Sequence, residues 1–265
     1  MHKDEGFIET MQLEGRKPVL EALKNNRPID RLLINKDMQG TLQVIAAKAR
    51  ENGVVVTAVE KPKLDALAQS GNHQGVIALC PAKDYVEVSE ILDIATAKGE
   101  QPFVVVLDGI TDPHNMGAIL RTADAGGVHG VITPKRRAVG LTGAVAKTSA
   151  GAIEYMPVAK VTNIGRTIDE LKEAGLWIVC GVDVGESSSG SNKRTSLYDS
   201  DMSGPVVLVI GAEGSGVSRL VRDKSDFEVY IPMLGQMSSL NASVAAGIMI
   251  YEVVRTRDNS KNRNG

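Results

Sequence analysis

The sequence predicts an α/β fold built on a parallel β-sheet with helices on both faces. Strand-like and helix-like segments alternate from residue 102 to residue 257, as they do in folds of this class. The segments 103–107 (FVVVL) and 206–210 (VVLVI) are continuous apolar runs, which strands buried on both faces require. The composition is 43% hydrophobic, 23% charged and 3% aromatic, which indicates a globular chain with an aliphatic core.

A smaller α/β domain is predicted before this sheet, over residues 11–84. Within it, segments with helical spacing of apolar residues alternate with strand-like runs. The helical segments are 16–26, 40–53 and 61–70, and the strand-like runs are 29–36, 54–59 and 75–80. Residues 85–101 are predicted to form a linker that runs into a short helix.

The larger domain is predicted over residues 102–257, where the same two periodicities alternate. Its expected strands are 103–110, 128–133, 156–161, 176–184, 205–211 and 227–233. Its expected helices are 116–127, 143–155, 164–175, 217–224 and the segment from Val244 onward. Residues 185–204 form a Gly- and Ser-rich loop, for which disorder and a partner contact are both open, and 258–265 form a polar tail.

Composition excludes several classes of protein. Cys80 and Cys180 lie in apolar runs, which favours buried free thiols over a disulfide or a metal site. The four histidines show no ligand spacing, so no metal is expected. The sequence has neither a membrane-spanning apolar run nor a signal peptide, so we expect a cytoplasmic protein with no membrane partner. The net charge of −2 argues against a generally basic nucleic-acid binder but allows local basic patches.

Three loops that follow predicted strands carry more polar residues than helix capping requires. The carboxyl ends of parallel strands share one edge of a sheet, so we expect these loops to converge on one site. In the first loop, Asp112 or Asn115 could cap the next helix, and Arg121 follows nearly two turns later. A capped helix with a surface arginine is the structural alternative.

The second loop bends at glycines 211, 214 and 216, where the backbone can approach a ligand closely. Its spacing matches neither the dinucleotide fingerprint nor the P-loop, which argues against the rival class of nucleotide-binding dehydrogenases and kinases. Glu213 would repel a phosphate, so a cationic or neutral ligand is favoured. Capping of the next helix is the alternative role for this carboxylate.

The third loop places Ser238, Ser239, Asn241 and Ser243 before the last helix, although one cap is enough. The remaining hydroxyl and amide groups are therefore free to line a binding site.

Together, the segments DPHNMGAILRTADAGG, LVIGAEGSGVSRL and IPMLGQMSSLNASVAAGI closely resemble the three signature motifs of the SpoU (TrmH) branch of the SPOUT RNA methyltransferases, in the family's order. The resemblance covers residues 102–257. EGRKPVLEAL and NHQGVIA resemble the small ribosomal-protein-like RNA-binding domain that precedes the catalytic domain in the 23S rRNA guanosine 2′-O-methyltransferases. Ala242 stands where many relatives carry valine, a packing change that should not affect the chemistry.

The resemblance implies a C-terminal trefoil knot, S-adenosylmethionine bound in that knot, and a homodimer with its active site near the dimer interface. It implies methylation of a ribose 2′-hydroxyl in RNA, with a guanosine of 23S rRNA as the expected target. A tRNA ribose is one alternative, and a catalytically silent RNA-binding or ribosome-assembly paralogue is another. By motif matching, the functional side chains are Asn115, Arg121, Glu213, Ser239 and Asn241. The cofactor would be cradled by backbone around Gly211, Ile231 and Leu240.

Within this family pattern, Arg121 is expected to anchor substrate phosphate and to stabilise the developing alkoxide. An arginine stays protonated, so a role as a base is chemically demanding. The asparagines and Ser239 would orient the ribose, and Glu213 would order its loop. Contacts to phosphate and to the shape of folded RNA are expected from exposed basic residues, although ordinary surface is the alternative for each. The candidates are Arg16, Lys17, Arg27, Arg31, Arg136 and Arg137.

Overall fold

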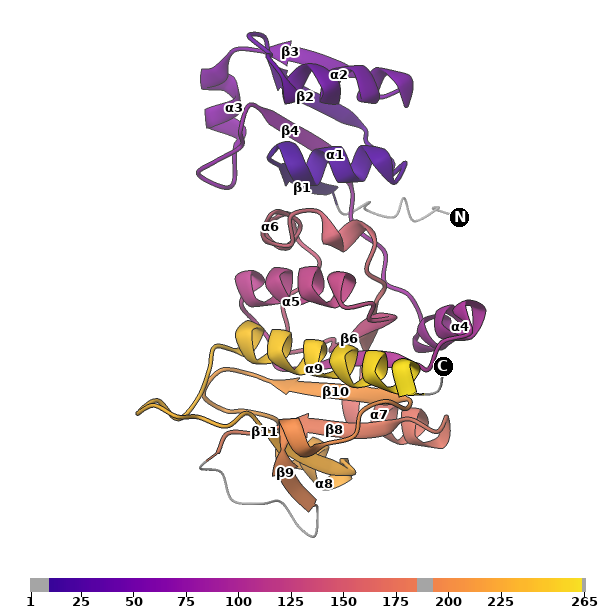
Figure 1. Cartoon of the computed structure of the whole chain (residues 1–265). Helices are drawn as coiled ribbons and strands as arrows, with labels where there is room; N and C mark the ends of the chain where they lie inside the picture. Colours follow the sequence, from indigo (N-terminus) through magenta and orange to yellow (C-terminus); the bar gives the residue numbers. More distant parts are fainter. Residues whose placement is uncertain (1–9, 185–192, 264–265) are drawn as a thin grey trace, which may run out of the picture. The chain divides into compact units, whose positions relative to one another are not determined.

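The computed structural model of the protein describes residues 10–184 and 193–263 (Figure 1). Residues 1–9, where we expected no signal peptide, lie outside the described residues. So do residues 185–192 of the predicted polar loop and the last two residues of the predicted tail. The chain forms two compact units. Unit 1 contains the residues up to Asp84 together with Gly140–Tyr155, and unit 2 contains Tyr85–Val139 together with the residues from Met156 onward.

Unit 1 has a four-stranded sheet in the order β1-β4-β2-β3, in which only β2 and β3 run parallel. Helices cover both of its faces. Its strands are β1 (Thr10–Glu14), β2 (Arg31–Asn35), β3 (Val56–Val59) and β4 (Val76–Pro81). Its helices are α1 (Arg16–Lys24), α2 (Thr41–Glu51), α3 (Lys61–Leu67), α6 (Gly143–Thr148) and the short 3-10 helix η1 (Ala152–Glu154).

Successive side chains along each strand of unit 1 point to opposite faces of the sheet, so both faces contribute to the core. Leu33 of β2 and Ile77 of β4 pack with Leu64 of α3 on one face. The neighbouring positions Leu32 and Ile34 are fully buried on the other. Strand β1, which sequence periodicity did not predict, adds one antiparallel edge strand to the sheet.

Unit 2 is built on a seven-stranded sheet in the order β7-β6-β5-β10-β8-β11-β9, and all its strand pairs are parallel. The predicted α/β class with a parallel sheet is therefore confirmed. Its strands are β5 (Phe103–Asp108), β6 (Gly130–Pro134), β7 (Val158–Val161), β8 (Trp177–Gly181), β9 (Lys193–Ser196), β10 (Val206–Gly211) and β11 (Phe227–Tyr230). Its helices are α4 (Val88–Lys98), α5 (Pro113–Ala125), α7 (Ile164–Glu173), α8 (Arg219–Lys224), α9 (Ala242–Arg263) and the 3-10 helix η2 (Leu197–Asp199).

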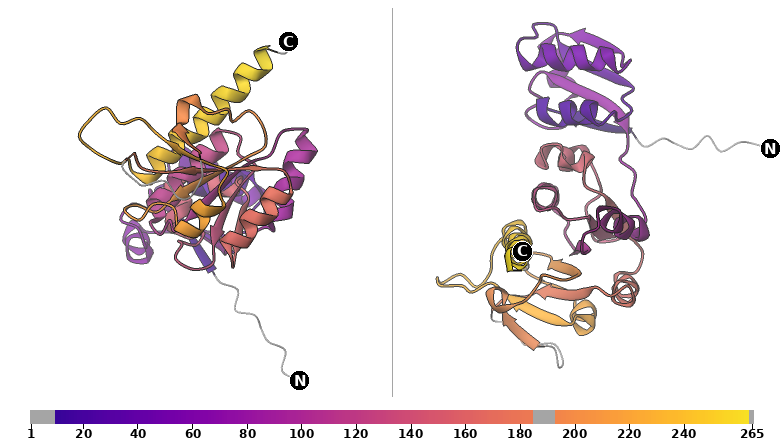
Figure 2. Two further views of the ribbon diagram at one scale, coloured as in Figure 1. Left: turned by 90° about the horizontal axis from the view of Figure 1, so that it is seen from below. Right: turned by 45° about the vertical axis from the view of Figure 1, so that its right-hand side comes forward.

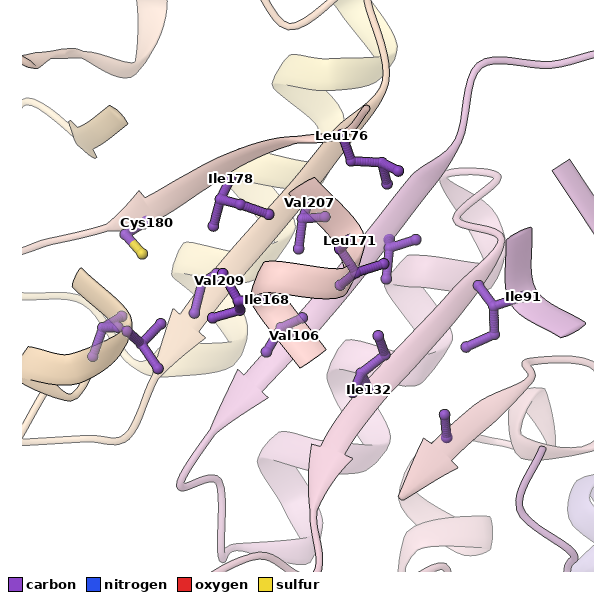
Figure 3. Close-up of a cluster of buried hydrophobic side chains, with 14 residues drawn as sticks. Ile91, Val106, Ile132, Ile168, Leu171, Leu176, Ile178, Cys180, Val207 and Val209 are labelled. Atoms are coloured by element: carbon purple, nitrogen blue, oxygen red, sulfur yellow. The ribbon is translucent and has the colours of Figure 1, made fainter. Parts of the chain in front are cut away.

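One face of the larger sheet is covered by α4, α7 and α8. Figure 3 shows Ile168 and Leu171 of α7 lying over Val106 and Val209 of the central strands. These side chains are fully or almost fully buried, and together they form the aliphatic core that the composition predicts. Helices α5 and α9 pack against each other on the opposite face, where α9 also contacts β10.

Two segments differ from their predicted domain assignment. Residues 85–101, predicted as a linker, belong to unit 2, because Val86 bridges to Ala159 and Ile91 of α4 is fully buried in the core. Residues 140–155, predicted as part of the larger domain, pack within unit 1. The chain therefore passes between the two units three times instead of once.

The last helix also differs from expectation. Helix α9 continues to Arg263, through most of the segment predicted as a polar tail. Before it, the chain from β11 to α9 projects as a long loop in all three views (Figures 1 and 2). Among the described residues, no helix is both long and apolar enough to cross a membrane.

Candidate active site

The first two polar loops leave the sheet side by side, because they follow adjacent parallel strands. Gly211 at the end of β10 pairs in register with Asp108 at the end of β5. The Asp108 carboxylate accepts a hydrogen bond from the backbone N–H of Ser218, at 2.8 Å, and so ties the two loops together. The predicted convergence at the carboxyl edge of the sheet is thus observed for these loops.

Three predicted side chains meet at this edge, one from each loop. Asn115 donates through Nδ2 to Oε1 of Glu213 at 3.2 Å, and its Oδ1 accepts from Nδ2 of Asn241 at 3.0 Å. Asn241 Nδ2 also donates to the same Glu213 oxygen. We call this set the amide–carboxylate triad. It leaves Oε2 of Glu213 without a hydrogen bond to another described residue.

Helix capping explains why the two asparagines take these positions. The carboxylate of Asp112 accepts from the His114 N–H at 3.0 Å and caps α5, and Pro113 occupies the first turn. Asn115 is therefore not the cap, and its buried side chain is free to reach Glu213. Asn241 does cap: its Oδ1 accepts from the N–H groups of Ser243 at 3.0 Å and Val244 at 3.3 Å.

The glycine-rich loop is a tight, closed bend. Ala212 and Gly216 pair with each other through two backbone hydrogen bonds, of 2.9 and 3.2 Å. Gly214 and Gly216 have φ of 80° and 62°, which favour glycine. A Cβ at Gly211 would collide with the backbone of Gly216 and Val217. The glycines thus fold the loop back on its own strand, and Glu213 lies at the exposed turn.

A cavity of about 370 Å³ lies between this bend and the third loop. Its lining includes every residue predicted to hold the cofactor, together with three of the five predicted functional side chains. These are Gly211, Ile231, Leu240, Glu213, Ser239 and Asn241. Apolar groups from β10, β11 and α9 line the rest of the wall, among them Ile210, Val229 and Met249. The mixture of apolar surface, exposed loop backbone and one carboxylate suits a medium-sized, partly apolar ligand that carries positive charge.

Sequence reasoning missed several residues of this cavity. Asp183 and Val184 follow β8, and Met233 and Met237 belong to the projecting loop. Because β8 ends at the same sheet edge as the predicted site, its place in the alternation of strands and helices could have identified Asp183 and Val184. The methionines carried no such signal.

Arg121 lies apart from the triad within a single chain. It is exposed on α5, does not line the cavity, and makes no hydrogen bond or ion pair with another described residue. Six residues separate it from Asn115, which is about 9 Å along the axis and about two-thirds of a turn around it. The two side chains of the first motif therefore point to different faces of α5.

The predicted RNA-contact residues divide into two groups. Arg16, Lys17, Arg31, Arg136 and Arg137 are exposed. The loop that carries the last two is fixed at both ends, by hydrogen bonds from Lys135 N–H to the Val161 carbonyl and from Val139 N–H to the Ile110 carbonyl. Both arginines therefore lie near the first motif, at the site's edge of the sheet.

Arg27 belongs to neither group, which corrects its selection from the sequence. Its side chain is 7% exposed, and its guanidinium pairs with the buried carboxylate of Glu154 at 2.5 Å. It also donates to the Pro81 carbonyl. Because these contacts bury it in the core of unit 1, Arg27 is not available to bind RNA in this structure. Within the described residues, no group of three His, Cys, Asp or Glu side chains could hold a metal ion.

Comparison with known proteins gives two family matches that together span most of the chain. The model of the SpoU rRNA methylase family matches residues 102–251. The model described as RNA 2′-O ribose methyltransferase substrate binding matches residues 12–86.

Individual proteins resemble the chain over almost its whole length. YacO of Bacillus subtilis (strain 168), assigned to the TrmH family of tRNA/rRNA methyltransferases, is 46% identical over 92% of this chain and 95% of its own. The SpoU methyltransferase AviRb from Streptomyces viridochromogenes, solved with AdoMet, is 27% identical with a TM-score of 0.74, over 94% of this chain and 91% of its own. An AdoMet-bound rRNA methyltransferase from Sinorhizobium meliloti is 26% identical with a TM-score of 0.74, over 93% of this chain and 87% of its own.

Proposed function

Because the chain belongs to the SpoU (TrmH) family of RNA 2′-O ribose methyltransferases, we propose that it methylates the ribose 2′-hydroxyl of a guanosine in 23S rRNA, with S-adenosylmethionine as donor. The observation that carries the proposal is the amide–carboxylate triad beside the cavity. Three loops distant in sequence bring Asn115, Glu213 and Asn241 within hydrogen-bond distance of one another at the mouth of a ligand-sized cavity. Residues matched to the family's motifs thus lie together.

The residues of the cavity fit this cofactor. Apolar walls suit its adenine ring, and the backbone near Gly211 and Leu240 can bond the polar edges of adenine and ribose. When bound, S-adenosylmethionine supplies a methyl group that is already activated by a sulfonium. The negative charge of Glu213 favours a cationic group at the cavity mouth, and the two asparagine amides hold that carboxylate in place.

The remaining work of the site is to orient the ribose and to stabilise charge on its oxygen. Positioning the hydroxyl in line with the methyl group lowers the entropic part of the barrier. Ser239, exposed at the cavity, is placed to orient the ribose. The permanent positive charge of Arg121 would bind a substrate phosphate and stabilise the developing alkoxide.

We further propose that two copies of the chain complete the active site. Arg121 points away from Asn115 on its own helix, so a second chain is the natural source of the missing cation. Exposed apolar side chains near the site support such an interface: Leu234 and Met237 on the projecting loop, and Val244 and Tyr251 on α9. The trefoil knot stays a prediction from family membership. The proposed location is the cytoplasm, where the enzyme would meet rRNA.

The preference for rRNA over tRNA rests on the N-terminal domain. The substrate-binding family matches residues 12–86, and the rRNA methyltransferase from S. meliloti aligns with 93% of the chain, including this domain. A domain of this kind gives the enzyme a second binding surface for a large folded RNA.

Three experiments test the proposal. Purified protein should transfer labelled methyl from S-adenosylmethionine to rRNA, and its melting temperature should rise with S-adenosylhomocysteine but not with NAD or ATP. Mapping of 2′-O-methylation in total RNA from cells lacking the protein should then reveal one lost methyl group in 23S rRNA. A methyl group lost from tRNA instead would refute the rRNA assignment. No transfer to any RNA would identify a catalytically silent paralogue.

A further inference from the structure

Unit 1 contains a second cavity, of about 550 Å³, which is strongly polar. It lies where the end of β2, the start of α2, α3 and the loop before β4 meet. Its lining contains no Phe, Tyr or Trp, and Leu42 and Gly75 are among its few apolar or small members. The proposed methyl transfer in unit 2 does not use this cavity.

The wall formed by residues 73–75 is held rigidly. His73 is buried, and its Nδ1 accepts the Gly75 N–H at 3.0 Å while Nε2 contacts the Asp65 carboxylate at 2.8 Å. Because Nδ1 accepts this bond and Nε2 faces the carboxylate, both ring nitrogens are already occupied. Gln74 accepts the Arg16 N–H at 3.0 Å and has a φ of 53°. These residues therefore shape the cavity and are not themselves free to bind.

The adjacent residues 69–72 are held in place by hydrogen bonds to Glu14 and to Lys147, both distant in sequence. The buried Glu14 carboxylate accepts from the N–H groups of Gln69 at 2.6 Å and Ser70 at 3.0 Å. Lys147 of α6 donates to the Ser70 hydroxyl at 2.6 Å and to the Asn72 carbonyl at 2.7 Å. A loop of small polar residues is thus fixed in one conformation. Such preorganisation is typical of a recognition surface and lowers the cost of binding.

The side chains that remain free carry donors and acceptors that complement the edge of a nucleobase. The side chains of Gln39, Asn72, Asp37 and Lys61 make no hydrogen bond or ion pair with other described residues, and they line the cavity. Arg16 uses only Nε, toward the Gln74 carbonyl at 3.2 Å. The lining has two cations, Arg16 and Lys61, and two carboxylates, Asp37 and Asp65, so its formal charge balances. A phosphate site would carry an excess of cations, whereas amides and a carboxylate match the donors and acceptors of a base.

We propose that this cavity, the base pocket, binds one unpaired nucleotide of the RNA substrate and reads its base through Asn72, Gln39 and Asp37. The proposal rests on the proposed function for the nature of the ligand. It makes unit 1 a reader of sequence at this point, in addition to the phosphate and shape contacts expected from its exposed basic residues. Single-stranded bases are the part of RNA whose edges a protein can read most directly.

The test is selection from a pool of single-stranded 12-nucleotide RNAs of random sequence, with the full chain as bait. Wild-type protein should enrich one base about tenfold at one position, the discrimination expected of one good set of base contacts. The double variant Gln39→Ala/Asn72→Ala should lose this enrichment. Gln43→Ala, a change of an exposed amide on α2 four residues after Gln39 but outside the pocket, should keep it.

Two further variants separate base recognition from general affinity. Asn72→Asp exchanges a donor for an acceptor and should change which base is enriched. Lys17→Gln, a change of an exposed cation next to Arg16 but outside the pocket, should weaken binding to the whole pool without altering the enriched base. Equal recovery of all bases by the wild type, or unchanged enrichment by the double variant, would overturn the proposal.

The outcome is independent of the proposed methyl transfer. Each variant is first required to bind S-adenosylhomocysteine in calorimetry as the wild type does, which shows that unit 2 is intact. Absence of transfer to any RNA, with base enrichment retained, would refute the enzyme and keep the pocket. Transfer to rRNA without base enrichment would refute the pocket and keep the enzyme.

Discussion

In the proposed mechanism, Arg121 is the residue on which the chemistry depends most. The Arg121→Ala variant should lose methyl transfer by roughly 10²- to 10³-fold, the usual effect of removing one group that stabilises developing charge. Its affinity for S-adenosylhomocysteine should stay within about twofold, because Arg121 does not line the cavity. Single-turnover transfer and calorimetry measure the two quantities. Arg166→Ala, a change of an exposed arginine on α7, serves as the control, and near-normal turnover by Arg121→Ala would contradict the assignment.

His129 makes unit 2 sensitive to acid. Burial lowers the pKa of its imidazole, and a contact of Nε2 with Glu100 at 3.1 Å only partly opposes this effect. Its Nδ1 accepts the Phe103 N–H at 3.0 Å, so the folded state favours the neutral ring. When folding lowers the pKa of a basic group, the neutral form of that group favours the folded state. The contribution of His129 is therefore complete above its ordinary pKa of 6.5, and it is lost as pH falls through the lower folded value.

Urea titrations between pH 8 and pH 5 test this prediction. Trp177, the one tryptophan of the chain, lies in unit 2 and reports its unfolding by fluorescence. Below pH 6.5 the wild type should lose stability more steeply than His129→Gln, which cannot take up a proton. Parallel curves for the two proteins would show that the ring does not control this transition.

At the scale of elements, the start of α9 combines a capping role with a proposed functional role. Asn241 caps the helix with Oδ1 and holds Glu213 with Nδ2. Asn241→Ser keeps a capping oxygen but removes the amide, so stability should change little while cofactor binding weakens. Asn241→Ala removes both groups and should also cost about 1 kcal/mol of stability. Fluorescence-detected unfolding and calorimetry with S-adenosylhomocysteine separate the two effects, and equal stability of the two variants would argue against the cap.

The elements that sequence periodicity missed are those that depend on partners distant in sequence. Strand β9 (Lys193–Ser196) has no apolar run, yet it pairs in parallel with β11. An edge strand needs main-chain hydrogen bonds more than apolar side chains, so its residues carry little pattern. By contrast β5 and β10 were predictable, because burial on both faces demands continuous apolar runs.

At the scale of the whole molecule, segment 140–155 joins unit 1 through a buried ion pair. Arg27 and Glu154 are 7% and 1% exposed, so removal of one partner leaves an uncompensated charge. Arg27→Ala should therefore destabilise unit 1 by about 3–5 kcal/mol. Lys24→Ala, which breaks the more exposed pair with Glu21, should cost at most about 1 kcal/mol.

Two probes distinguish unit 1 from unit 2 in this experiment. Circular dichroism should show an earlier transition in Arg27→Ala, while the Trp177 fluorescence midpoint stays near that of the wild type. The apolar double variant Arg27→Met/Glu154→Leu should recover much of the loss. A shift of the fluorescence midpoint alone would mean that the ion pair stabilises unit 2 and not unit 1.

The sequence by itself determined the α/β class, the strands of the sheet centre and the family, because burial and the three motifs leave local patterns. It also indicated Asn115, Glu213 and Asn241 individually as candidate site residues. Only the tertiary structure decided that these three side chains bond to one another, that Asp112 and not Asn115 caps α5, and that Arg27 is buried. It likewise assigned residues 140–155 to unit 1. Apart from the Asp112 cap, which depends on local backbone geometry, each of these facts is a contact between segments far apart in the chain, and local periodicity carries no information about such contacts.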